Sequence, residues 1–398
     1  MIIKPRVRGF LCTAAHPVGC ERDVQRDIAY VARRAPITSG PRNVLIVGAS
    51  GGYGLASRIS AAFGAGANTL GVFFERGADG KRTASPGWYK TAAFTEAAAG
   101  AGLYAGNIQG DAFSDEIKQQ AIDTIIREMG GKVDLVVYSV AAPARQIPGG
   151  ELKRSTLKPI GQAFSGKTID FNTRDIREIA LEPATIKETA DTVQVMGGED
   201  WELWIDALRA ADVLAQGCIT TNYTYLGSEV TWPIYFHGTI GKAKEDLDRA
   251  SRALAAPMAG VGGSARVCVM KGLVTQAAAA IPGMPIYLSL LFKVMQDAGT
   301  HEGCIEQTQR LFETGLYAAE PVAPDDAGRL RMDDLELGRD VQDYVKANWN
   351  VTAENLAAVA DFDAYRDAFL ALHGFGIDGV DYDVEVDPVR TFAMEAVL

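Results

Sequence analysis

The clearest indication of the fold is the stretch Arg42-Asn-Val-Leu-Ile-Val-Gly48-Ala-Ser-Gly-Gly52-Tyr-Gly54-Leu-Ala-Ser. An apolar, β-branched run enters a glycine-rich turn, and the turn opens directly into a helical pattern. Glycine lets the backbone turn tightly and approach a ligand, and the free N–H groups at a helix start attract an anion. The stretch therefore predicts a strand, a phosphate loop and a helix, as in the first turn of a nucleotide-binding α/β sheet.

The glycines of this loop form G-x-x-x-G-x-G, the variant used by short-chain dehydrogenase-like folds. A structural turn without a ligand is the alternative interpretation of the glycines alone. A second strand pattern, Leu70-Gly-Val-Phe-Phe-Glu75, ends in an acid 21 residues after Gly54. A carboxylate at this spacing accepts hydrogen bonds from ribose hydroxyls and repels a 2′-phosphate, which favours NAD over NADP. Arg76 beside it leaves NADP open.

The composition is that of an ordinary globular α/β protein, with 398 residues, 47% hydrophobic and 22% charged. The net charge of −11 argues against general nucleic-acid or anionic-membrane binding. The five cysteines form no C-x-x-C pair and there are four histidines, so we expect free thiols and no metal site. We recognise no signal peptide, membrane span or heptad pattern, and we expect a cytoplasmic monomer.

Four successive βα units predict a doubly wound parallel sheet of the Rossmann, short-chain-dehydrogenase-like type. We expect one domain over 1–398, with an N-terminal extension (1–41), a cofactor- and substrate-binding core (42–320) and a helical C-terminal region (321–398) packed on the core. Residues 144–200 are polar and predict a solvated insertion with a short strand pair near Ile169.

Residues that follow the predicted strands are candidates for cofactor contacts. Asp111 could hydrogen-bond the adenine amino group or, as the alternative, cap the helix from Ser114. Small residues after the strand Val133–Tyr138 suit a close approach of the backbone to the cofactor. A sixth strand is predicted before Gly272-Leu-Val-Thr275, where Rossmann sheets place the nicotinamide.

A tyrosine followed by a lysine on the next helix is the machinery of short-chain reductases. The phenol donates a hydrogen bond to a substrate carbonyl, and the ammonium holds the nicotinamide ribose and favours phenolate. Tyr235 follows the fifth predicted strand and has two candidate partners, Lys242 and Lys244. They lie about 200° apart on a continuous helix, so one should face the cofactor and the other solvent.

The whole chain resembles the NADH-dependent trans-2-enoyl-CoA reductases, also described as enoyl-acyl-carrier-protein reductases of the long, single-domain type. The motifs that carry the resemblance are Pro5-Arg-Val-Arg-Gly-Phe, Ala15-His-Pro-Val-Gly-Cys, Gly48-Ala-Ser-Gly-Gly-Tyr-Gly, Thr224-Tyr-Leu-Gly, Thr231-Trp-Pro-Ile-Tyr-Phe-His-Gly-Thr-Ile-Gly-Lys-Ala-Lys and Leu273-Val-Thr-Gln.

The resemblance implies Tyr235 as proton donor, Lys244 as its cofactor-binding partner in a Y-x8-K pattern, and Tyr225 as a substrate contact. It implies NADH as cofactor, with contacts at Gly48, Ala49, Ser50, Gly51, Gly52, Tyr53, Phe74, Glu75, Asp111, Ala112, Ser139, Val140, Lys244, Leu273, Val274 and Thr275. The family's C-terminal segment has been labelled flavin-binding. Residues 320–398 show acidic helices without a glycine phosphate loop, so we expect no flavin.

The leading hypothesis is an enzyme of fatty acid biosynthesis that transfers hydride from NADH to C3 of a trans-2-enoyl thioester of coenzyme A or acyl carrier protein. The alternatives are an NAD-dependent carbonyl (3-ketoacyl) reductase and a non-catalytic NAD-sensing protein. The apolar segment 277–292, broken by Pro and Gly, predicts a mobile cover on the acyl pocket. A buried core helix is the alternative for that segment.

Overall fold

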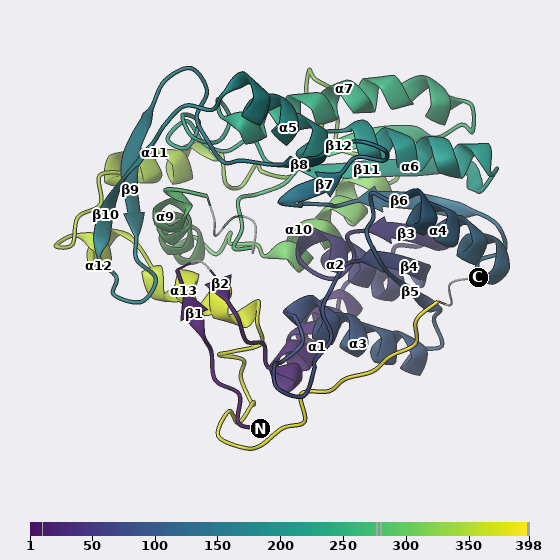
Figure 1. Ribbon diagram of the computed structural model, residues 1–398, viewed down its shortest axis with the longest axis horizontal. Helices are drawn as coiled ribbons and strands as arrows, with labels where there is room; N and C mark the ends of the chain where they lie inside the picture. Colours follow the sequence, from purple (N-terminus) through teal and green to yellow (C-terminus); the bar gives the residue numbers. More distant parts are fainter. Residues whose placement is uncertain (10, 276–277, 279–280, 396–398) are drawn as a thin grey trace.

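Seven parallel strands form the central sheet (Figure 1). The computed structural model describes residues 1–395, except residues 10, 276, 277, 279 and 280. The strands of the sheet are β3 (Asn43–Val47), β4 (Asn68–Phe73), β5 (Ala105–Gln109), β6 (Val133–Tyr138), β11 (Leu214–Thr224), β12 (Ser264–Val269) and β13 (Leu330–Arg331). Their spatial order is β13-β12-β11-β6-β3-β4-β5, which confirms the predicted doubly wound parallel sheet.

β3 and β6 are nearly continuous apolar runs because the sheet is covered on both faces. Residues 44–47 of β3 have no exposed surface. Leu45 lies opposite Leu70 of β4 and Val136 of β6, so the first strand of the sheet in sequence lies inside it. The strand order reverses between β3 and β6, and the carboxyl ends of strands at such a point border the crevice where these sheets bind ligands.

Helices cover the two faces. One face carries α4 (Asp115–Glu128), α6 (Glu199–Ala210) and α7 (Thr239–Ala259). On the other lie α2 (Gly52–Ile59), its π-helical continuation η1 (Ser60–Gly64), α10 (Cys304–Arg310) and η2 (Leu311–Leu316), with α1 (Pro17–Ala32) and α3 (Pro86–Gly100) packed outside them. Trp201 and Trp204 of α6 are completely buried against the sheet.

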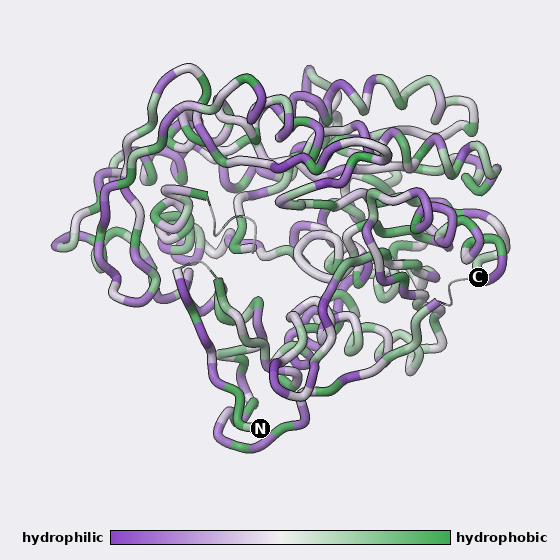
Figure 2. Tube along the Cα trace, viewed as in Figure 1, coloured by the Kyte–Doolittle hydropathy of each residue, from purple (hydrophilic) through white to green (hydrophobic). Residues whose placement is uncertain are grey.

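The insertion after β6 forms two hairpins and a helix. They are β7 (Ala144–Gln146) with β8 (Leu152–Arg154), β9 (Phe164–Ile169) with β10 (Ile176–Leu181), and α5 (Ile186–Met196). The strand pair predicted near Ile169 is confirmed. The insertion is not wholly solvated, because Ile169 and Phe171 are buried in a second hydrophobic core. In Figure 2, hydrophobic residues dominate the central strands and hydrophilic ones are frequent along β9 and β10.

The second core joins the insertion to the C-terminal region. Its helices are α9 (Met284–Asp297), α11 (Arg339–Asn348), α12 (Leu356–Val359) and α13 (Phe362–Ala371). Val345 of α11 and Phe369 of α13 pack in the same cluster as Tyr287 of α9 and Tyr235. The C-terminal region thus shares a core with the residue predicted to be catalytic. No helix among the described residues is both long and apolar enough to cross a membrane.

The N-terminus lies beside the C-terminal tail. The N-terminal segment carries a short hairpin, β1 (Val7–Arg8) with β2 (Leu11–Cys12), and the ammonium group of Met1 donates a hydrogen bond to the carbonyl oxygen of Val386. The last described residues then run to the open edge of the sheet (Figure 1), where the N–H of Glu395 donates to the carbonyl oxygen of Asn107 in β5 at 2.8 Å. This tail covers an edge strand that would otherwise expose unpaired backbone groups.

Candidate active site

The glycine loop between β3 and α2 has the geometry of a phosphate-binding turn. Gly48 has a φ of 89°, and a Cβ there would collide with the carbonyl oxygen of Ser139. A Cβ on Gly54 would collide with the carbonyl oxygen of Gly48. Gly51 is the N-cap of α2 and supplies no side-chain cap, so the first N–H groups of the helix remain available to an anion.

A cavity of about 730 Å³ extends from this loop along the carboxyl ends of the parallel strands. The predicted site residues that line it are Gly48, Ser50, Gly51, Gly52, Tyr53, Phe74, Glu75, Asp111, Ala112, Ser139, Val140, Tyr225, Tyr235, Lys244, Leu273 and Thr275. Two predicted cofactor contacts, Ala49 and Val274, are not among the lining residues, and their contact with the cofactor stays a prediction. Ala49 has no exposed surface and packs in the core beside β3, and Val274 packs in the core around α9.

A carboxylate is fixed at the end of β4. Ser50 Oγ donates a hydrogen bond to Glu75 Oε1 at 2.7 Å, and the backbone N–H of Glu75 donates to Gln109 Oε1 at 3.1 Å. The neighbouring Phe74 side chain is 78% exposed and also lines the cavity. This arrangement ties the acid to the phosphate loop, as expected of a group that accepts hydrogen bonds from ribose hydroxyls.

The loop after β5 is held by a buried ion pair. Lys118 Nζ of α4 lies 2.9 Å from Asp200 Oδ1 of α6 and donates to the carbonyl oxygen of Phe113 at 3.0 Å. Asp111 Oδ1 accepts the N–H of Phe113, and Ser114 is the N-cap of α4. The alternative that Asp111 caps this helix is therefore wrong, and Asp111 lies on the cavity wall.

Tyr235 is 5% exposed and lies in the turn between β11 and α7. Its ring packs edge-on against the ring of Tyr225, with the centroids 5.1 Å apart and the planes at 62°. Burial raises the pKa of Tyr235 above its ordinary value. The phenol is therefore neutral near pH 7 and can donate a hydrogen bond or a proton.

The two candidate lysines point in different directions. Lys244 lines the cavity, and its Nζ is 3.4 Å from the carbonyl oxygen of Tyr223. Burial lowers the pKa of Lys244 to about 8. Lys242 is exposed and forms an ion pair with Glu245 at 2.7 Å. Lys244 is thus the lysine that shares the cavity with Tyr235.

Tyr225 lines the cavity with its ring, but its hydroxyl is directed elsewhere. It donates to Glu336 Oε1 at 2.9 Å, and Glu336 also accepts from the hydroxyl of Tyr287 at 2.6 Å and the N–H of Gly272 at 2.6 Å. Glu336 is completely buried and lies outside the cavity lining. Glu336 was not among the residues predicted from the sequence to lie at the site.

The predicted cover over 277–292 divides into two parts. Residues 277, 279 and 280 lie outside the described residues. Ala278, Ile281 and Met284 line the cavity. From Met284 onward the segment is α9, and Tyr287 and Leu290 have no exposed surface. The core-helix alternative is confirmed for this second part, while a cover over 278–283 stays a prediction.

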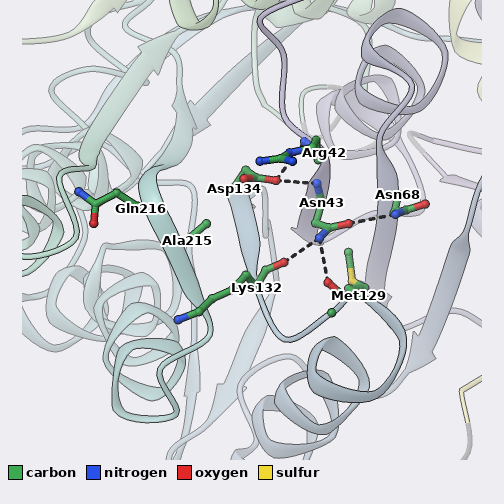
Figure 3. Close-up of a pocket in the computed structure, with 9 residues that line it drawn as sticks. Arg42, Asn43, Asn68, Met129, Lys132, Asp134, Ala215 and Gln216 are labelled. Carbon is green, nitrogen blue, oxygen red and sulfur yellow. Dashed lines mark hydrogen bonds between the residues drawn. The ribbon is translucent and has the colours of Figure 1, made fainter.

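A second hollow lies at the opposite, amino-terminal edge of the sheet (Figure 3). Its polar groups are used to join strands: Asp134 Oδ2 accepts from the N–H of Asn43 at 2.8 Å, and Asn43 Nδ2 donates to the carbonyl oxygens of Met129 and Lys132. We assign this hollow a structural role. Among the described residues, no three His, Cys, Asp or Glu side chains converge as metal ligands would.

Three family models match the chain. The "Trans-2-enoyl-CoA reductase catalytic region" matches residues 82–317, and the "NAD(P)H binding domain of trans-2-enoyl-CoA reductase" matches residues 2–80. The "Enoyl reductase FAD binding domain" matches residues 324–386. Together the three matches extend over almost the entire chain.

Curated proteins and solved structures agree with these matches. The chain is 60% identical to the "Enoyl-[acyl-carrier-protein] reductase [NADH]" of Burkholderia thailandensis over 98% of both chains. It is 54% identical to the enzyme of the same name from Edwardsiella ictaluri, also over 98% of both. A crystal structure of Clostridium acetobutulicum trans-2-enoyl-CoA reductase in complex with NADH superposes with a TM-score of 0.95, at 44% identity over 98% of both chains. A Treponema denticola trans-2-enoyl-CoA reductase in complex with NAD gives 0.93, at 46% identity over 100% of both.

The residues present fit a nicotinamide dinucleotide better than a flavin. The glycine loop, the free start of α2 and the fixed carboxylate of Glu75 supply complementary groups for a pyrophosphate and a ribose. Within 324–386, by contrast, only Leu372 lines the cavity. The helices of this segment turn apolar side chains such as Val345 and Phe369 inward to pack against α9, which leaves them unsuited to hold an isoalloxazine and its phosphates.

Proposed function

Since the chain belongs to the trans-2-enoyl-CoA reductase family and is an NADH-dependent enoyl thioester reductase, we propose that Tyr235 and Lys244 carry out its chemistry at one end of the cavity. The single observation that supports this assignment best is their position. Both line the same cavity as the phosphate loop, whereas Lys242 is exposed and paired with Glu245.

When bound, NADH supplies the hydride that adds to C3 of the enoyl thioester. Negative charge then develops on the thioester carbonyl oxygen, and Tyr235 donates a hydrogen bond to that oxygen. A donor aimed at developing charge stabilises the transition state more than the ground state. Tyr235, whose pKa is raised by burial, holds its proton until this charge appears and gives it up as C2 is protonated. A proton from water then restores the phenol, so the saturated product has gained one hydride at C3 and one proton at C2.

Lys244 holds the nicotinamide ribose and stabilises the negative charge that remains on Tyr235 after proton transfer. Burial lowers the pKa of Lys244 to about 8, so the ammonium form predominates near neutral pH. Tyr225 contributes its ring to the substrate wall, because its hydroxyl already donates to Glu336.

Glu75 gives the preference for NADH over NADPH. Its carboxylate, fixed by Ser50, accepts hydrogen bonds from the adenosine ribose and repels a 2′-phosphate. We also propose that catalysis requires no flavin, that the enzyme is a cytoplasmic monomer, and that its carrier is coenzyme A or acyl carrier protein.

The experiment follows NADH oxidation by the purified chain with crotonyl-CoA and, separately, with acetoacetyl-CoA. Oxidation with crotonyl-CoA alone supports the assignment of the site to enoyl reduction. Oxidation with acetoacetyl-CoA alone would favour a carbonyl reductase, and NADH binding without oxidation of either would favour a sensor. Full activity of protein that shows no flavin absorbance supports the proposal that flavin is not required.

A further inference from the structure

A buried carboxylate from the C-terminal region stands directly behind the active-site wall. Glu336 has no exposed surface, and it belongs to the segment matched by the model described as FAD-binding. Its Oε1 accepts from the hydroxyls of Tyr225 and Tyr287, and its Oε2 accepts from the N–H of Gly272. Burying a carboxylate costs free energy unless its oxygens accept hydrogen bonds. The three donors satisfy the oxygens of Glu336 and so compensate for its burial.

Two of these donors belong to the active site itself. Tyr225 is the first residue after β11, and its ring packs against that of Tyr235. Gly272 precedes Leu273 and Thr275 on the loop after β12, which also lines the cavity. Glu336 therefore ties together the carboxyl ends of two neighbouring strands.

A second link from the same segment reaches the turn that carries Tyr235. Gln342 of α11 donates to the backbone oxygen of Glu336 at 2.8 Å and accepts from Ser228 Oγ at 2.5 Å. The carbonyl oxygen of Ser228 accepts the N–H of Thr231 at 2.9 Å, and the carbonyl oxygen of Thr231 accepts the N–H of Tyr235 at 3.0 Å. The C-terminal region thus holds the 225–235 segment at its first residue and again at Ser228.

Burial and the surrounding groups act in opposite directions on the pKa of Glu336. Burial raises the pKa of Glu336, while the positive charge of Lys271 and the hydrogen bonds from Tyr287, Gly272 and Tyr225 lower it. Lys271 is itself buried. A carboxylate with a nearby cation and three donors keeps a defined orientation, and so do the groups that it binds.

We propose that Glu336 is a positioning residue for the reductase, which holds Tyr225 and the loop at Gly272 so that Tyr235 faces the thioester carbonyl. The inference rests on the proposed function, in which Tyr235 is the proton donor. It gives the 324–386 segment a role in orienting the catalytic tyrosine. Glu336 acts through Tyr225, since it does not itself line the cavity.

The test compares Glu336→Gln with a matched control, Asp333→Asn, in the full-length enzyme. Asp333 is another buried carboxylate three residues away, but it pairs with Arg331 at 2.7 Å, which is not part of this network. We expect Glu336→Gln to lower kcat with NADH and crotonyl-CoA by about tenfold to a hundredfold, because small misplacements of a reacting group have effects of this size. Kd for NADH should change less than about twofold, and Asp333→Asn should keep the wild-type kcat.

A double-mutant cycle separates positioning from general loosening. If Glu336 acts through Tyr225, adding Tyr225→Phe to Glu336→Gln should lower kcat by less than about twofold more. Fully multiplicative losses, or a wild-type kcat in Glu336→Gln, would overturn the inference. If Glu336→Gln does not fold, Gln342→Met replaces it: a reduced kcat with unchanged NADH affinity supports the inference, and a normal kcat overturns it. An active Tyr235→Phe enzyme would instead contradict the proposed function, so the two failures are distinguishable.

Discussion

Replacing Lys244 with Ala should impair the enzyme far more than replacing Lys242 with Ala. Lys244 lines the cavity, while Lys242 is exposed beside Glu245. Losing one preorganised charged group at a site of developing charge costs about 3 kcal/mol, which corresponds to about a hundredfold in kcat/KM. A surface ion pair such as that of Lys242 contributes at most about 1 kcal/mol to stability, and its loss should leave kcat/KM near the wild-type value.

The lowered pKa of Lys244 adds a pH dependence to this prediction. With a pKa of about 8, roughly nine tenths of the side chain is charged at pH 7 and roughly one tenth at pH 9. If the ammonium form is required, kcat/KM should fall as pH rises through about 8. The Lys242→Ala enzyme should show the same fall, and Lys244→Ala should show none. Lys244→Arg should restore little activity, because a planar guanidinium does not replace a compact ammonium.

The assay is steady-state NADH oxidation with crotonyl-CoA between pH 6.5 and 9.5. Wild-type activity in Lys244→Ala at pH 7 would refute the assignment, and so would an equally large loss in Lys242→Ala. Retention of the alkaline fall in Lys244→Ala would show that another group titrates there.

Two further substitutions test other parts of the molecule. Glu75→Ser should lower the ratio of kcat/KM for NADH to kcat/KM for NADPH by at least about tenfold, because the fixed carboxylate no longer repels a 2′-phosphate. The control is Glu96→Ser, since Glu96 is an exposed acid on α3. An unchanged ratio in Glu75→Ser would reject the proposed role of Glu75. Glu395→Ala should lower the free energy of unfolding by about 1 to 3 kcal/mol, because Glu395 accepts from the Tyr104 hydroxyl at 2.6 Å and pairs with Arg127 at 2.8 Å. Urea denaturation measures this loss, and an unchanged midpoint would mean that the tail does not stabilise the sheet edge.

The central fold was predictable because its signals are local. β3, β4 and β6 are largely apolar runs, and the glycine loop between β3 and α2 identifies the first of them. β13 was missed, since two residues have no periodicity and the strand is defined only by its pairing with Cys268 and Val269. The segment 277–292 was ambiguous because an apolar run suits a cover and a core helix equally well.

The site was predictable to the extent that it depends on strand ends and helical spacing. Helix geometry required that only one of Lys242 and Lys244 face the cavity, and the structure places Lys244 there. Glu336 gave no signal, because it is one of 50 acidic residues in the chain. It lies 64 residues from Gly272 and 111 from Tyr225, and only tertiary packing brings them together.

The most direct test of the account is the Tyr235→Phe enzyme, measured for NADH affinity and for turnover of crotonyl-CoA. We propose that the phenol donates to the substrate carbonyl, and the ring packing against Tyr225 should survive in Phe. We expect kcat/KM to fall by at least about a hundredfold while Kd for NADH changes less than about twofold. Turnover close to that of the wild type would contradict the assignment of Tyr235 as proton donor.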